Sequence, residues 1–210
     1  MFLITLPDYE IATRYASKWA ELTIKFTTLK VIKLSQKKAN KKTVSSFLKK
    51  QPVKLVMFNG HGDESTIYGN DDEVLIKSGL NEDLLNSKIV YAVACSCAAI
   101  LGPSSVKKGC KAFIGYKRPF MFAGWGNAHN PILDDRAKPF FESSNLIVTS
   151  LMKGCTVEES CNKSKQLIQN SISQLLSSQA TNDDRMDASM LFWNSTNLTY
   201  SGNGKSDIYH

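Results

Sequence analysis

The chain has 210 residues, 42% of them hydrophobic, and a formal net charge of +7. A chain of this size buries one sizeable core, so we expect a single domain over residues 1–210. Its apolar runs fall short of the roughly 18 residues that a membrane-spanning helix needs, which predicts a soluble protein without a membrane segment. The five cysteines lack a secreted-scaffold spacing and the N-terminus lacks a signal peptide, so we expect a cytoplasmic protein with reduced thiols.

Nine lysines between residues 30 and 54 carry much of the positive charge. This segment contains no arginine, and its one aromatic residue is Phe47. Nucleic-acid sites usually combine arginine forks with stacking aromatics, so the composition favours a solvated helix face. A basic nucleic-acid-binding module stays open as an alternative function.

Short apolar runs alternate with helical patterns along the whole chain. The predicted strands, in chain order, cover 2–6, 29–34, 53–61, 88–95, 111–116 and 190–200. The predicted helices cover 9–22, 40–50, 81–86, 98–108, 134–152 and 156–177, and a small hairpin is expected over 65–76. Asn40 and Thr156 occupy helix N-cap positions, Thr156 as part of a capping box with Glu159. This alternation predicts an α/β fold, with a mostly parallel sheet covered by helices on both faces.

Two of the predicted strands end in residues with reactive side chains. The third strand runs into His61 and Gly62, and the fourth runs into Ala94 and Cys95. Because open α/β sheets use the carboxyl edge of their strands, we expect His61 and Cys95 to face one crevice. A thiol beside an imidazole is a nucleophile with its base.

These strand ends, in this order and 34 positions apart (95 minus 61), resemble the signature of the caspase-like cysteine peptidases. That group includes caspases, gingipains, legumains and CHAT domains, and the prokaryotic-type members are the most similar. Segments 96–103 and 109–116 resemble the helix and the strand that follow the cysteine in the prokaryotic and gingipain-like members. Segment 191–194 with 197–198 resembles the closing strand of those proteins. The resemblance implies a caspase-like three-layer sandwich and a cysteine endopeptidase for protein or peptide substrates, with no cofactor and no metal.

The chemistry of the two residues predicts their roles. Cys95 is the nucleophile, and a helix beginning directly after it would lower the pKa of its thiol. His61 is the general acid and base that protonates the leaving amine. The resemblance implies that the backbone N–H groups of Gly62 and Cys95 form the oxyanion hole.

Other readings of the same residues remain. Cys97 is a rival nucleophile, expected within the start of the following helix. His61, Cys95, Cys97 and Cys110 are suitable zinc ligands, although no C-x₂-C pair is present. His129 is interpreted as a loop residue.

The resemblance also suggests where substrate specificity is decided. When the caspase specificity loop is laid on residues 120–127, Gly126 replaces the arginine that binds substrate aspartate, and Trp125 offers an apolar wall. Asp63 would supply a carboxylate for a P1 Arg or Lys, unless it is an ordinary turn-capping residue. We therefore expect cleavage after basic residues, by an enzyme under the control of a protein partner or activator. A catalytically silent caspase-like scaffold is the alternative, against which intact His61 and Cys95 argue.

Overall fold

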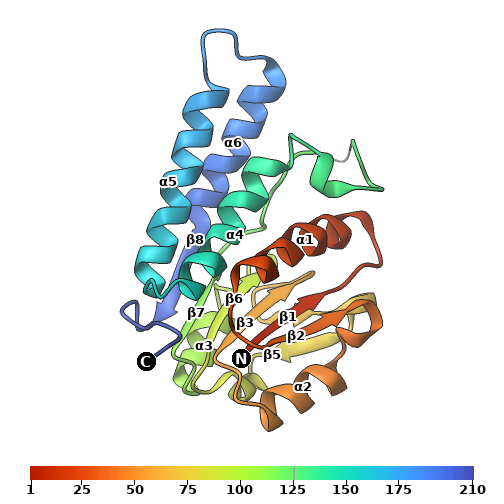
Figure 1. Ribbon diagram of the computed structural model, residues 1–210, viewed down its shortest axis with the longest axis vertical. Coiled ribbons are helices and arrows are strands. Elements are labelled where there is room, and N and C mark those ends of the chain that lie inside the picture. The colour runs from red at the N-terminus through yellow and green to blue at the C-terminus, as the bar shows by residue number, and fades with distance from the viewer. Residues whose placement is uncertain (125) are drawn as a thin grey trace.

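A six-stranded sheet in the order β2-β1-β3-β6-β7-β8 forms the centre of the computed structural model, which describes residues 1–124 and 126–210 (Figure 1). The strands are β1 (Phe2–Leu6), β2 (Val31–Ser35), β3 (Leu55–Asn59), β6 (Ile89–Val93), β7 (Ala112–Tyr116) and β8 (Leu198–Gly202). All neighbouring pairs are parallel except β7 and β8, which are antiparallel. The prediction of a mostly parallel sheet is confirmed.

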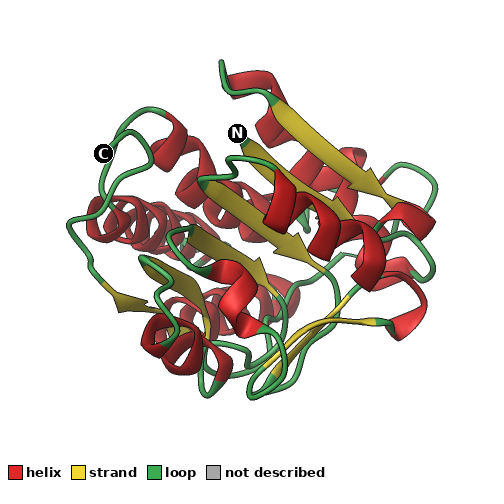
Figure 2. Cartoon of the chain, turned by 90° about the horizontal axis from the view of Figure 1, so that it is seen from below, coloured by secondary structure: helices red, strands yellow, loops and turns green. Residues whose placement is uncertain are grey.

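Helices cover both faces of the sheet (Figure 2). They are α1 (Ile11–Glu21), α2 (Lys41–Lys50), α3 (Leu101–Lys107), α4 (Lys138–Met152), α5 (Val157–Leu175) and α6 (Asn182–Asn197). Short 3₁₀ turns occupy Leu22–Phe26, Gln36–Lys38, Asn70–Asp72, Glu82–Leu85 and Pro131–Leu133. The predicted hairpin is confirmed, because β4 (Thr66–Tyr68) pairs antiparallel with β5 (Val74–Lys77).

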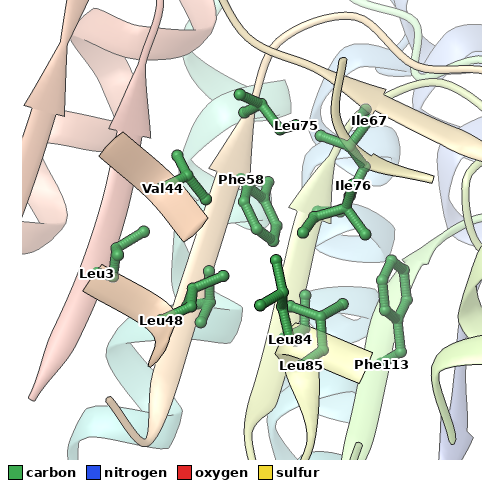
Figure 3. Packing of buried hydrophobic residues seen from close by; sticks show 14 of the residues in the cluster. Leu3, Val44, Leu48, Phe58, Ile67, Leu75, Ile76, Leu84, Leu85 and Phe113 are labelled. Atoms are coloured by element: carbon green, nitrogen blue, oxygen red, sulfur yellow. The ribbon is translucent and has the colours of Figure 1, made fainter. Parts of the chain in front are cut away.

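The strands are apolar on both faces because both faces are covered. Residues Leu3, Phe58 and Phe113 pack with α2 and the β4–β5 hairpin, as Figure 3 shows. Their chain neighbours Phe2 and Met57 point the other way, into a cluster with α4 and the start of α5. The alternation of side chains along each strand therefore builds two cores, one on either side of the sheet.

Local hydrogen bonds begin the helices where the sequence predicts. Asn40 Oδ1 accepts the Thr43 N–H at 2.8 Å, which caps α2. Thr156 Oγ1 accepts the Glu159 N–H at 3.3 Å, while Glu159 Oε2 accepts the Thr156 N–H at 2.8 Å. Helix α2 buries Val44 and exposes its four lysines, which is the arrangement of a solvated helix face.

The predicted last strand is wrong over most of its length. Residues 190–197 form the C-terminal half of α6, and the strand begins only at Leu198. Thr181 and Asp184 form a capping box that starts a helix, and Leu191 and Asn194 continue its buried face at a spacing of three. Segment 191–194 is therefore helical, and the resemblance to a closing strand does not extend to it.

Three further predicted helices differ in the structure. The segment 81–86 forms a 3₁₀ turn, and α3 begins at Leu101, after a run of turns that follows Cys95. Helix α4 begins at Lys138, because Pro131–Leu133 forms a separate 3₁₀ turn before it. Within the described ranges, no helix has the length and apolar character needed to cross a bilayer.

Candidate active site

His61 and Cys95 leave the sheet from neighbouring strands at matching positions. Strands β3 and β6 are parallel, and their last residues, Asn59 and Val93, pair with each other. His61 and Cys95 each follow two positions later. The register of the sheet therefore brings both residues to its carboxyl edge, from neighbouring strands.

Two glycines let the His61 segment turn tightly toward Cys95. Gly60 has φ +142°, and a Cβ there would lie 2.5 Å from the Tyr68 carbonyl oxygen. A Cβ on Gly62 would lie 2.9 Å from both the Ala94 Cβ and the Cys95 carbonyl oxygen. The His-Gly and Ala-Cys segments are therefore packed directly against each other.

A small pocket of about 70 Å³ is bordered by both reactive residues. Among the described residues, its lining is Ala12, Thr13, Ala16, Gly60, His61, Val93, Cys95, Phe120, Phe122 and Phe141. Helix α1 supplies one wall, and the aromatic wall comes from Phe120 and Phe122 in the loop after β7 and from Phe141 in α4. Cys95 is half-buried here, whereas 39% of the His61 side chain is exposed.

Glu10 contacts His61 from the side of the ring that bears Nε2. The Oε1 atom of Glu10 lies 2.5 Å from His61 Nε2, and the Tyr9 ring meets the imidazole edge-on at 6.1 Å. Glu10 is the N-cap of α1, where its backbone N–H donates to Thr13 Oγ1 at 3.3 Å. This contact engages Nε2, so Nδ1 is the ring nitrogen outside the contact with Glu10.

Glu10 was not expected from the sequence to contact His61. The one available signal is that Glu10 follows soon after the first strand, 2–6. Strand β1 pairs parallel with β3, so its carboxyl end opens onto the same edge of the sheet. That pairing is not visible in the sequence, because nothing local identifies β3 as the neighbour of β1.

The thiol of Cys95 is held in its protonated form. Burial raises the pKa of Cys95, and the Phe120 backbone N–H opposes this only in part. The expected lowering by a helix N-terminus is wrong, because α3 begins at Leu101, six positions further on. Cys95 is followed by Ser96 in the left-handed region at φ +58°. A nucleophile in this setting needs a base to remove its proton.

Two backbone N–H groups near the thiol are free of hydrogen bonds to the described residues. Gly62 pairs with Ile67 in an isolated antiparallel bridge. The flanking bonds run from Asp63 N–H to the Thr66 carbonyl and from Tyr68 N–H to the His61 carbonyl, both 3.0 Å. The Gly62 N–H therefore takes no part in the hydrogen bonds on either side of this bridge. Neither the Gly62 N–H nor the Cys95 N–H has an acceptor among the described residues.

Cys97 does not share the pocket. It is fully buried, its Sγ donates to the Ala94 carbonyl at 3.2 Å, and burial raises the pKa of its thiol. Cys110 donates to the Lys88 carbonyl, which precedes β6 at the other end of that strand. Across residues 1–124 and 126–210, no three His, Cys, Asp or Glu side chains are placed to hold a metal ion.

Of the residues expected to set specificity, Asp63 and Gly126 are not among the described residues that line the pocket. The Asp63 carboxylate accepts the Ser65 N–H at 2.7 Å and the Tyr68 hydroxyl at 2.8 Å. Although partial burial opposes it, these bonds hold the pKa of Asp63 below its usual value. This geometry matches the turn-capping alternative. The Gly126 N–H donates to Asp134 Oδ2 at 3.1 Å, and Trp125 lies outside the described residues.

A scan against protein-family models and a search of curated proteins give no match. Among solved structures, the chain is similar to the Arg-specific cysteine proteinase gingipain R, with a TM-score of 0.60 at 12% sequence identity. The match covers 97% of this chain but 46% of that one, so this chain spans about half of its length. The expected fold class is confirmed: the chain has the α/β fold of this caspase-like cysteine proteinase.

Proposed function

We propose that the chain is a cysteine endopeptidase in which Cys95 is the nucleophile and His61 the general acid and base. The observation that carries the proposal is that the paired ends of β3 and β6 bring both side chains to one pocket. The cysteine-proteinase fold of gingipain R supports it. Glu10, in contact with His61 Nε2, acts as a positioning residue that fixes the ring and its tautomer.

In the first chemical step, Cys95 Sγ attacks the carbonyl carbon of the scissile peptide bond while its proton moves to His61 Nδ1. The C–N bond then breaks as His61 returns that proton to the leaving amine, which leaves a thioester on Cys95. Water attacks the thioester, giving one proton to His61. The S–C bond breaks and His61 passes the proton to the released thiolate, which restores the thiol.

The raised pKa of Cys95 makes His61 essential to this scheme. A buried thiol does not ionise by itself near neutral pH, so proton transfer must accompany the attack. In each tetrahedral intermediate, the backbone N–H groups of Gly62 and Cys95 would donate to the oxyanion. Both are without an acceptor among the described residues, which supports this assignment.

The test is cleavage of a diverse peptide library by the purified protein beside a Cys95→Ala variant. We expect the purified protein to cleave peptides of the library and the Cys95→Ala variant to cleave none. Peptide binding without cleavage in either protein would instead support the catalytically silent scaffold. Control by a protein partner or activator stays a prediction, and addition of cell extract to the same assay would reveal it as a Cys95-dependent gain in rate.

A further inference from the structure

We propose that Asp72, in the turn of the β4–β5 hairpin, is a positioning residue for the proposed base His61, and that it acts through Tyr9. This inference rests on the proposed function, because it concerns the orientation of the base in the same site. It extends the support of His61 beyond the contact with Glu10, to a hairpin that forms a sheet of its own.

Tyr9 joins the turn of the hairpin to the imidazole of His61. Its hydroxyl donates to Asp72 Oδ1 at 2.5 Å, and its ring meets the imidazole edge-on, with 6.1 Å between the ring centroids. The residue after Tyr9 is Glu10, whose carboxylate contacts His61 Nε2. Two consecutive residues therefore contact the imidazole, and the hydrogen bond to Asp72 holds the first of them.

The hairpin also holds the residue before Tyr9. The buried side chain of Asn70 accepts the Asp8 N–H with its Oδ1 at 3.1 Å. Asp8 and Tyr9 are thus both bonded to the turn Asn70–Asp72, one through its backbone and one through its side chain. The link between β1 and α1, which carries Glu10, is therefore fastened to the hairpin at two consecutive residues.

Strand β4 of the same hairpin is bonded to the backbone of His61. The Tyr68 N–H, at the end of β4, donates to the His61 carbonyl at 3.0 Å, and Gly62 pairs with Ile67. The hairpin therefore holds the backbone of His61 directly and supports its ring through Tyr9. A displacement of Tyr9 would leave that backbone in place and free the ring to turn, and small displacements of a catalytic group are costly in rate.

The backbone of the turn has an uncommon conformation. Asp71 and Asp72 both have φ +55°, in the left-handed region that residues other than glycine rarely occupy. Such conformations persist where surrounding contacts determine them, and they are frequent at functional sites. The side chain of Asp72 has such a contact with Tyr9, whereas that of Asp71 has no hydrogen bond or ion pair with the described residues. The two neighbours share the backbone conformation and differ in the contact.

Tyr9 is suited to hold His61 and not to exchange protons with it. Burial and the hydrogen bond to Asp72 raise the pKa of Tyr9, so its hydroxyl keeps the proton near neutral pH. That proton is engaged by the Asp72 carboxylate. The role left for Tyr9 is to restrict the imidazole by contact.

The first experiment compares Asp72→Ala with Asp71→Ala. Both substitutions place Ala at φ +55°, so both add the same kind of backbone strain, but only Asp72→Ala removes the acceptor of the Tyr9 hydroxyl. We expect Asp72→Ala to lower kcat about 10-fold with little change in KM, and Asp71→Ala to leave kcat unchanged. Asp72→Asn should retain most of the activity, because its Oδ1 accepts the same hydrogen bond. Equal losses of kcat in the two alanine variants would overturn the inference and leave the proposed function intact.

A double variant tests whether Asp72 acts through Tyr9. Tyr9→Phe keeps the ring beside His61 and removes the hydroxyl, so it should lower kcat as much as Asp72→Ala does. The double variant should be no slower than either single variant, because both changes break the same hydrogen bond. Losses that multiply in the double variant would overturn the inference. Tyr9→Phe leaves the turn unaltered, so an unchanged kcat in this variant overturns it even where Asp72→Ala does not fold.

A third measurement does not depend on turnover. The chain has three histidines, so the ring-nitrogen NMR signals of His61 can be assigned by comparison with a His61→Gln variant. We expect Asp72→Ala and Tyr9→Phe to shift these signals and Asp71→Ala to leave them in place. If no peptide is cleaved but this pattern is seen, the peptidase function fails and the positioning of His61 holds. Signals that stay unchanged in all three variants overturn the inference, with or without cleavage.

Discussion

His61 Nε2 and Glu10 Oε1 lie 2.5 Å apart, although 51 positions separate the two residues in the chain. The contact joins the N-terminus of α1 to the turn after β3. Nδ1, on the other side of the ring, is the nitrogen to which the proposed mechanism assigns the proton of Cys95. The orientation of the proposed base therefore depends on a residue from a different part of the sequence.

Glu10→Gln should lower kcat about 10-fold to 100-fold with little change in KM. Gln keeps the size of the side chain and its oxygen can still accept a hydrogen bond from Nε2, but it lacks the negative charge that favours a proton on the ring. This removes part of the 10²–10⁴ in rate that general acid–base catalysis contributes. The pH profile of kcat should change shape as well. Glu21→Gln, at the other end of α1, is the matched control, and an equal loss there would show that the effect comes from the helix.

Cys95→Ala should abolish peptidase activity, whereas Cys97→Ala should keep most of it. Only Cys95 borders the pocket with His61, and the Cys97 thiol is buried against the Ala94 carbonyl. The assay is peptide cleavage with a stability check by thermal unfolding. The reverse result, with Cys97 essential and Cys95 dispensable, would assign the nucleophile to Cys97.

Gly62→Ala should reduce turnover by about 10²–10³, the loss that removal of one oxyanion donor causes. The added Cβ would lie 2.9 Å from the Cys95 carbonyl oxygen, so one of the two segments must move. Gly126→Ala is the matched control, because its nearest heavy atom, Asp134 Oδ2, would be 3.9 Å away. Equal kcat in both variants would remove Gly62 from the oxyanion hole.

Alkylation of Cys95 in the free protein should accelerate steeply as the pH rises through the alkaline range. Burial raises the pKa of this thiol, so the reactive thiolate is scarce below that pKa and increases tenfold per pH unit as the pH approaches it. The measurement is the iodoacetamide rate against pH, read at Cys95 by mass spectrometry. The midpoint should lie above about 8.5, the ordinary value for cysteine. A rate already maximal at pH 6 would indicate a stable thiolate–imidazolium pair instead.

The same labelling experiment compares the cysteines. Cys97, Cys110 and Cys161 are buried, and burial raises the pKa of each thiol, so they should react more slowly than Cys95. Uniform rates for these four thiols would contradict the placement of Cys95 at an open pocket.

Thr181→Ala should destabilise the fold by about 1 kcal/mol, the usual effect of losing an N-cap side chain. Thr181 Oγ1 accepts the Asp184 N–H at 3.1 Å at the start of α6. Thermal unfolding measures the change, and Thr181→Ser should retain most of the stability because the hydroxyl remains. No difference between the two variants would argue that α6 starts elsewhere.

Local sequence signals are sufficient to predict several elements of the fold. The apolar runs of β3 and β6, the cap at Asn40 and the capping box at Thr156 depend on residues within a few positions of one another. His61 and Cys95 could be found because each directly follows such a run. Local patterns failed at 190–197, where an apolar run resembling a strand is the end of a helix started by Thr181.

Long-range contacts in the folded chain establish which strand ends meet and which residues surround them. The pairing of Asn59 with Val93 delivers the two reactive side chains together, and the pairing of β1 with β3 brings Glu10 to His61. The chain forms turns after Cys95, so no helix N-terminus lies beside the thiol to lower its pKa. Burial of the thiol raises that pKa instead. These features depend on contacts between residues far apart in the chain, and such contacts leave no periodic or local trace in a single sequence.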